Sequence, residues 1–127
     1  MIEILIIDDN LIIRHMLKMH IELDPDIKVV GENEINARSA DLASKYKPDV
    51  ILVDFDMLGP AAGQALEDLH KAAPEIPVIA TSLNNSDVNV IVAKEAGAVD
   101  FVAKQADTVD LIKAIHKAVD FSGPASD

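Results

Sequence analysis

Short, mostly aliphatic runs alternate along this chain with longer segments whose apolar residues follow helical spacing. Such runs are typical of strands buried on both faces of a parallel sheet. They predict five strands, at residues 4–7, 27–30, 50–53, 78–81 and 99–103. The intervening segments predict five helices, within residues 11–23, 35–46, 62–69, 88–96 and 109–119. Because the links are short, we expect right-handed crossovers and a three-layer, doubly wound (βα)5 sandwich of the α/β class around a parallel five-stranded sheet.

Individual residues mark several ends of these elements. Asn10 can cap the helix that begins at Leu11, and Asp107 can cap the last helix. Gly97 can close the fourth helix as its C′ residue. Glycines and a proline predict a loop at residues 58–63. One face of the fourth helix carries the apolar residues Val88, Ile91, Val92 and Ala96.

Composition and length narrow the functional class. The 127 residues predict one domain, which we expect at residues 1–120, with 121–127 as a tail or a linker truncated by excision. The net charge of −11 argues against direct binding to nucleic acid. The absence of cysteine excludes disulfides and thiolate chemistry. No apolar run approaches the ~20 residues of a membrane span, so we expect a cytoplasmic protein that does not bind membranes.

Polar residues follow four of the predicted strands directly. Asp8 and Asp9 follow the first strand, Asp54 the third, Ser82 the fourth and Lys104 the fifth. Because parallel strands end at one edge of a sheet, these side chains should converge there, where open α/β sheets bind ligands. Clustered carboxylates repel one another unless a cation lies among them, and their oxygens suit Mg²⁺. Together with a hydroxyl and an ammonium group, they predict a phosphoryl site.

With this pattern, residues 2–120 resemble the receiver domain of two-component response regulators. The resemblance rests on the five polar residues above, together with Gly97-Ala98 and Phe101. Residues 24–33 are similar to the subfamily that usually carries a helix-turn-helix output domain. The resemblance implies a flavodoxin-like strand order of 2-1-3-4-5.

The resemblance also implies roles for the site residues. Asp54 would accept a phosphoryl group from a phosphohistidine of a sensor histidine kinase or phosphotransfer protein. The required Mg²⁺ (or Mn²⁺) would be held by Asp8, Asp9, Asp54 and the backbone carbonyl of Asp56. Lys104 would pair with the phosphoryl oxygens. Asp56 and Asn84, two residues beyond Asp54 and Ser82, would tune dephosphorylation.

A conformational switch is implied as well. Ser82 is preferred over Thr81 as the switch hydroxyl because it lies 22 residues before Lys104 and because adjacent strand residues point in opposite directions. On phosphorylation Ser82 would swing to the phosphoryl group, and Phe101 would turn inward. We expect this pair to promote a homodimer, or partner binding, through the fourth helix, fifth strand and fifth helix. On that face we expect exposed apolar residues among Val90, Val109 and Ile112.

Three positions depart from the family pattern. Leu58 replaces a proline, Leu83 replaces a small residue and can narrow access to Asp54, and Gln105 replaces a proline that often has a cis bond. A cis bond before a residue other than proline costs about 2.5 to 4 kcal/mol, so we expect a trans bond before Gln105. These departures leave the phosphorylation kinetics open.

Two alternatives remain at this point. Leu83 and the altered loop allow a pseudo-receiver that binds partners without phosphorylation. Asp54-Phe55-Asp56 also fits the DxD motif of haloacid-dehalogenase-type phosphatases, although those enzymes place it after the first strand and follow it with a threonine. The histidines fall on predicted helices away from the strand ends, so we interpret them as solvated residues rather than ligands; they are His15, His20, His70 and His116.

Overall fold

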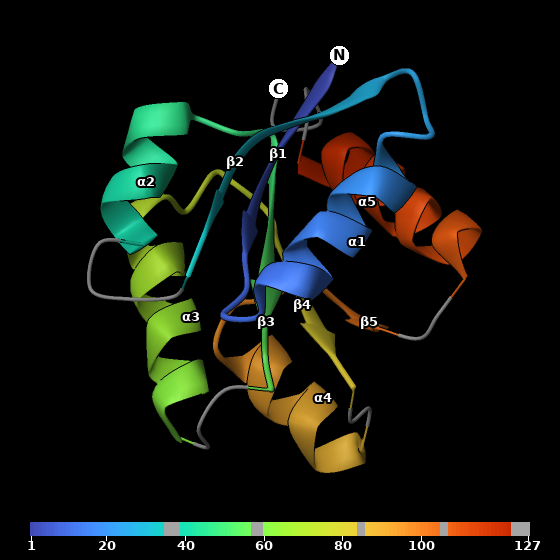
Figure 1. Cartoon of the computed structure of the whole chain (residues 1–127). Helices are drawn as coiled ribbons and strands as arrows, with labels where there is room; N and C mark the ends of the chain where they lie inside the picture. The colour runs from blue at the N-terminus through green and yellow to red at the C-terminus, as the bar shows by residue number, and fades with distance from the viewer. Residues whose placement is uncertain (35–38, 57–59, 84–85, 105–106, 123–127) are drawn as a thin grey trace.

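The computed structural model describes residues 1–34, 39–56, 60–83, 86–104 and 107–122. Five strands form one parallel sheet in the order β2-β1-β3-β4-β5, which confirms the predicted flavodoxin-like architecture (Figure 1). In chain order the elements are β1 (Ile2–Ile7), α1 (Leu11–Ile21), β2 (Ile27–Asn33), α2 (Ser39–Tyr46), β3 (Val50–Asp54), α3 (Pro60–Ala72), β4 (Val78–Ser82), α4 (Asp87–Glu95), β5 (Asp100–Ala103) and α5 (Thr108–Ser122).

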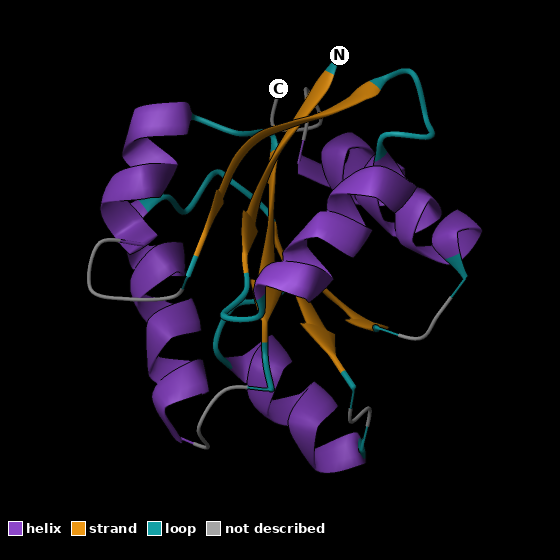
Figure 2. Cartoon of the chain, viewed as in Figure 1, coloured by secondary structure: helices purple, strands orange, loops and turns teal. Residues whose placement is uncertain are grey.

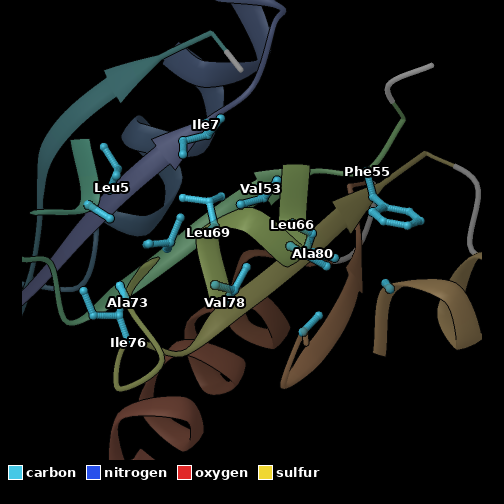
Figure 3. Close-up of a cluster of buried hydrophobic side chains, with 14 residues drawn as sticks. Leu5, Ile7, Val53, Phe55, Leu66, Leu69, Ala73, Ile76, Val78 and Ala80 are labelled. Carbon is cyan, nitrogen blue, oxygen red and sulfur yellow. The ribbon is translucent and has the colours of Figure 1, made fainter. Parts of the chain in front are cut away.

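Helices cover both faces of the sheet, as Figure 2 shows. Successive strand residues point to opposite faces, so Leu5 and Ile7 pack beneath α2, α3 and α4, whereas Ile4 and Ile6 pack beneath α1 and α5. Figure 3 shows the first of these two apolar layers, in which β1, β3 and β4 meet Leu66 of α3. Because both faces are covered, the central strands are apolar along almost their whole length.

The register of the sheet aligns the strand ends. Ile7 pairs with Val53, so the residues that follow them, Asp8 and Asp54, emerge at the same level. Asp54 lies opposite Thr81 on β4. Ser82 lies opposite Ala103, immediately before Lys104. Backbone pairing therefore brings residues far apart in sequence to one edge of the sheet.

Several boundaries differ from the predicted ones. The segment predicted as a loop at 58–63 is helical from Pro60, because proline is well suited to the first helical turn, where its missing N–H costs no hydrogen bond. β2 continues to Asn33, with a register shift opposite the Ile4 to Leu5 step. Leu58, Asn84 and Gln105 lie outside the described residues. Within the described ranges, no helix is both long and apolar enough to span a membrane.

The orientation of α4 differs from the expected one. Val88 and Ile91, on its predicted apolar face, are 68% and 55% exposed, whereas the small residue Ala93 is fully buried. Ser86 caps the helix by accepting a hydrogen bond from Asn89 N–H at 3.3 Å. Gly97 ends it with φ of 117°, which confirms the predicted C′ glycine. The caps and the small buried residue, rather than the apolar stripe, define the packing of this helix.

Candidate functional site

Lys104 lies at the centre of a cluster of carboxylates at the carboxyl edge of the sheet. Its Nζ lies 2.8 Å from Asp54 Oδ1, 3.1 Å from Asp8 Oδ2 and 3.2 Å from Asp56 Oδ2. Burial lowers the pKa of Lys104, but its contacts with Asp54 and Asp8 outweigh burial, and the net pKa is raised. The ammonium group therefore stays charged and offsets part of the repulsion among the three carboxylates.

Asp54 is buried at the end of β3, where its backbone is held by the sheet. Its Oδ1 accepts hydrogen bonds from Lys104 Nζ and, at 2.8 Å, from the N–H of Asp56. Burial raises the pKa of Asp54; the bonds from Lys104 and the Asp56 N–H oppose this rise, and the charge of Asp8 adds to it. A carboxylate of raised basicity beside a fixed ammonium group has the chemistry of a nucleophile for phosphoryl transfer.

Asp8 is held in place by the start of α1. Its Oδ1 accepts a hydrogen bond from Asn10 N–H at 2.9 Å, and Arg14 Nη1 donates to its carbonyl oxygen. Asn10 in turn caps α1 by accepting from Ile13 N–H at 3.1 Å, as predicted. The side chain of Asp9, next along the chain, is exposed at this edge.

The acidic residues fit a hard divalent cation. Asp8 is 1% exposed, and its Oδ2 accepts no well-aligned hydrogen bond, although Lys104 Nζ lies nearby. In the part of the chain that the structure describes, no three carboxylate or imidazole side chains form a ready metal cage. Mg²⁺ needs no such cage, because it keeps several waters and binds proteins through one or two carboxylates.

The side chain of Asp56 makes contacts that the sequence reasoning missed. Its Oδ1 accepts a hydrogen bond from the Ser82 hydroxyl, and its Oδ2 accepts one from Leu83 N–H at 2.7 Å. Burial raises the pKa of Asp56, but these bonds and the charge of Lys104 outweigh burial and hold that pKa below its ordinary value. The Asp-x-Asp spacing was a possible signal, because a second carboxylate two residues after Asp54 stays near the same strand end.

The two hydroxyls at the end of β4 face different partners. Ser82 is fully buried and points to Asp56, whereas Thr81 donates to the Val53 carbonyl within the sheet at 3.3 Å. Phe101 is half-buried and lies edge-to-face against Phe55, with ring centroids 6.3 Å apart. The structure thus brings Ser82 into the acidic cluster and packs Phe101 against the apolar layer under α4.

The four histidines lie outside this cluster. His15, His20 and His70 are exposed on α1 and α3. His116 on α5 contacts Asp24, with Nε2 2.7 Å from Oδ2, at the amino-terminal end of the sheet. None of the four histidines is therefore placed to bind a metal ion at the carboxyl ends of the strands.

Comparison with known proteins identifies the family. The model of the response regulator receiver domain matches residues 4–116. The nitrate/nitrite response regulator protein NarL of Escherichia coli (strain K12) is 34% identical over 115 residues, which cover 91% of this chain and 53% of that protein. The transcriptional regulatory protein DegU of Brevibacillus brevis is 32% identical, over 90% of this chain and 48% of its own length. The chain spans about half the length of these curated relatives.

Solved structures agree with this match. The response regulator domain of Thermotoga maritima CheB superposes with a TM-score of 0.81 at 32% identity, covering 94% of this chain and 96% of that one. Receiver domains are signalling switches and generally bind Mg²⁺ at the phosphorylation site. These similarities do not favour the pseudo-receiver or the phosphatase. The chain belongs to the response regulator receiver family of two-component systems, whose receiver domains act as phosphoacceptor switches.

Proposed function

We propose that Asp54 is the phosphoacceptor and that its phosphoryl donor is the phosphohistidine of a sensor histidine kinase or phosphotransfer protein. The observation that carries the assignment is the buried Asp54 carboxylate, which shares the Lys104 ammonium group with Asp8 and Asp56 at the edge where β1, β3, β4 and β5 end. The cytoplasm is the compartment we propose, because the phosphohistidine donor must reach this edge.

In the proposed reaction an Asp54 oxygen forms a bond to phosphorus while the bond between phosphorus and the donor imidazole nitrogen breaks. Lys104 neutralises charge on the transferred oxygens, and the burial of Asp54 keeps water from its carboxylate. Asp8, Asp9, Asp54 and the Asp56 carbonyl would hold Mg²⁺ (or Mn²⁺), which supplies charge neutralisation on the phosphoryl oxygens. The domain itself is a switch that promotes its own phosphorylation and dephosphorylation rather than an enzyme with a separate substrate.

The proposed output step begins at Ser82. Its hydroxyl leaves Asp56 for a phosphoryl oxygen, and Phe101 turns into the space beside β5. This coupling favours a homodimer or partner contact through α4, β5 and α5, where Val88, Ile91 and Val109 are exposed. Val90 and Ile112, expected on this face from the sequence, are instead half-buried. Asp56 and Asn84 remain our candidates for tuning the lifetime of the phosphorylated state.

Mass spectrometry after incubation with acetyl phosphate and Mg²⁺ tests the assignment. Wild type should gain one phosphoryl group, located on Asp54 by peptide mapping, and Asp54→Asn should gain none. Asp68→Asn, which changes an exposed carboxylate on α3, should behave as wild type does. Phosphate incorporation in Asp54→Asn would refute the assignment. No incorporation in wild type would point to a pseudo-receiver, and repeated release of phosphate from many monoesters would point to a phosphatase.

A further inference from the structure

We propose that the Asp56 carboxylate acts as an internal stand-in for the phosphoryl group and restrains both phosphorylation and the Ser82 switch. The proposal rests on the phosphoacceptor function of Asp54. It assigns to the Asp56 side chain a role distinct from metal binding by its backbone carbonyl.

Three donors converge on this one carboxylate. The Ser82 hydroxyl donates to Oδ1, Leu83 N–H donates to Oδ2 at 2.7 Å, and Lys104 Nζ lies 3.2 Å from Oδ2. They come from the ends of two neighbouring strands, β4 and β5, which the backbone pairing of Ser82 with Ala103 holds together. A hydroxyl, a backbone N–H and an ammonium group form an anion site of the kind that binds phosphoryl oxygens.

A phosphoryl group on Asp54 would need the same donors. Asp54 and Asp56 already share the Lys104 ammonium group, so a new anion on Asp54 competes with the Asp56 carboxylate for Lys104 and for Ser82. Two anions cannot occupy one set of donors without strong repulsion. Phosphorylation therefore requires the Asp56 side chain to leave the site.

The surroundings of Asp56 allow this movement. Its side chain is 24% exposed, whereas those of Asp8 and Lys104 are 1% and 5% exposed. Rotation of Asp56 towards solvent would release Ser82 and the Leu83 N–H for the phosphoryl oxygens. Before phosphorylation, the hydrogen bond to Asp56 holds the Ser82 hydroxyl in place and opposes its movement towards Asp54.

Rates of phosphorylation test this role. With acetyl phosphate and saturating Mg²⁺, Asp56→Ala and Asp56→Asn should each be phosphorylated on Asp54 about tenfold faster than wild type, which corresponds to about 1.4 kcal/mol in the barrier. Beryllofluoride should bind both variants more tightly by a similar factor. Circular dichroism should verify that both variants are folded. A faster rate in both then cannot come from one substitution that perturbs the fold.

Asp107→Asn is the matched control for charge alone. Asp107 lines the same surface cavity of about 480 Å³ as Leu83 and Lys104. Its substitution removes one negative charge near the site without removing the anion that holds Ser82, so the rate should change less than twofold. An equal acceleration in Asp107→Asn would mean that general repulsion of the anionic donor explains the effect, and would overturn the proposal.

Hydrogen exchange without metal or phosphodonor provides a second readout. The Leu83 amide should exchange faster in Asp56→Ala than in wild type and Asp107→Asn, because its acceptor is lost. An unchanged Leu83 exchange rate, or an unchanged phosphorylation rate in both Asp56 variants, would refute the stand-in role while leaving Asp54 as phosphoacceptor. If wild type accepts no phosphoryl group, the phosphoacceptor assignment itself is wrong, and the role of Asp56 falls with it.

Discussion

The Lys104 ammonium group offsets part of the repulsion among the carboxylates at the sheet edge, but it does not remove all of this repulsion. Asp54 is buried beside Asp8 and keeps a raised pKa despite the hydrogen bond from Lys104. The folded state therefore binds a proton on Asp54 more readily than the unfolded chain does. Linkage then requires the stability of the fold to decrease as pH rises through this raised pKa.

From this sign we predict that Asp54→Asn is more stable than wild type at pH 7 in metal-free buffer. The advantage should shrink as the pH falls from 7 through the raised pKa of Asp54, because Asp54 of the wild type then becomes protonated and neutral. Urea unfolding of both proteins across this pH range measures the difference. Asp68→Asn should show no comparable trend, and lower stability of Asp54→Asn at pH 7 would contradict the prediction.

Metal binding should discriminate between the acidic residues and Lys104. We expect Asp9→Ala to weaken Mg²⁺ affinity by about tenfold or more, the scale seen when residues that hold a metal are changed. Lys104→Ala should not cause a loss of this size, because it removes no oxygen ligand and takes away a positive charge that competes with Mg²⁺ for Asp8 and Asp54. Isothermal titration with Mg²⁺ measures both, and identical curves for wild type and Asp9→Ala would refute the ligand assignment.

Strands were easier to predict than helices in this chain because burial on both faces leaves an unmistakable run of aliphatic residues, as in β3. The strand ends, and with them Asp54 and Lys104, followed from the same runs. The packing of α4 did not, since its largest apolar residues face solvent and Ala93 faces the core. The contacts of the Asp56 side chain also escaped prediction, because they depend on side-chain direction in a loop rather than on periodicity.

Two glycines, Gly97 at the end of α4 and Gly63 inside α3, should respond differently to substitution by alanine. Gly97 has φ of 117°, and an added Cβ would lie 2.8 Å from His70 Cγ. Gly63 lies inside α3, where the nearest atom to an added Cβ is Val92 Cγ1 at 3.8 Å. We predict that Gly97→Ala lowers the free energy of unfolding by more than about 1 kcal/mol, whereas Gly63→Ala raises it by about 0.5 to 1 kcal/mol. Urea denaturation measures both, and equal effects of the two substitutions would contradict this account.

Across the whole molecule, several large apolar side chains on the helices face solvent instead of the core. On α1 the exposed residues Ile12, Met16 and Met19 follow helical spacing along one side, and the exposed Leu23 follows shortly after the helix. A second group includes Val88 and Ile91 of α4 and Val109 of α5. Where exposed apolar side chains form a contiguous patch, other proteins often bind. Phe101 packs against the layer beneath α4, so Val88 and Ile91 lie on the side that the proposed switch reaches.

We therefore predict that beryllofluoride with Mg²⁺ converts wild type from monomer to symmetric dimer through α4, β5 and α5. Light scattering coupled to size-exclusion chromatography measures the mass. Ser82→Ala and Ile91→Ser should remain monomeric, whereas Met19→Ser on α1 should still dimerise. If Ser82→Ala dimerises as wild type does, Ser82 does not couple phosphorylation to dimerisation. If Met19→Ser alone loses the dimer, the interface lies on α1 and the prediction is wrong.

The sheet divides the core into two apolar layers, and among the residues that the structure describes these layers have no buried member in common. Substitutions deep in opposite layers have no shared packing partner, so their effects on stability should be close to additive. Mutations can therefore accumulate beneath α2, α3 and α4 without requiring compensation beneath α1 and α5. For evolution, and for the design of rewired signalling circuits, the core beneath one face of the sheet can be repacked while the core beneath the other face is kept.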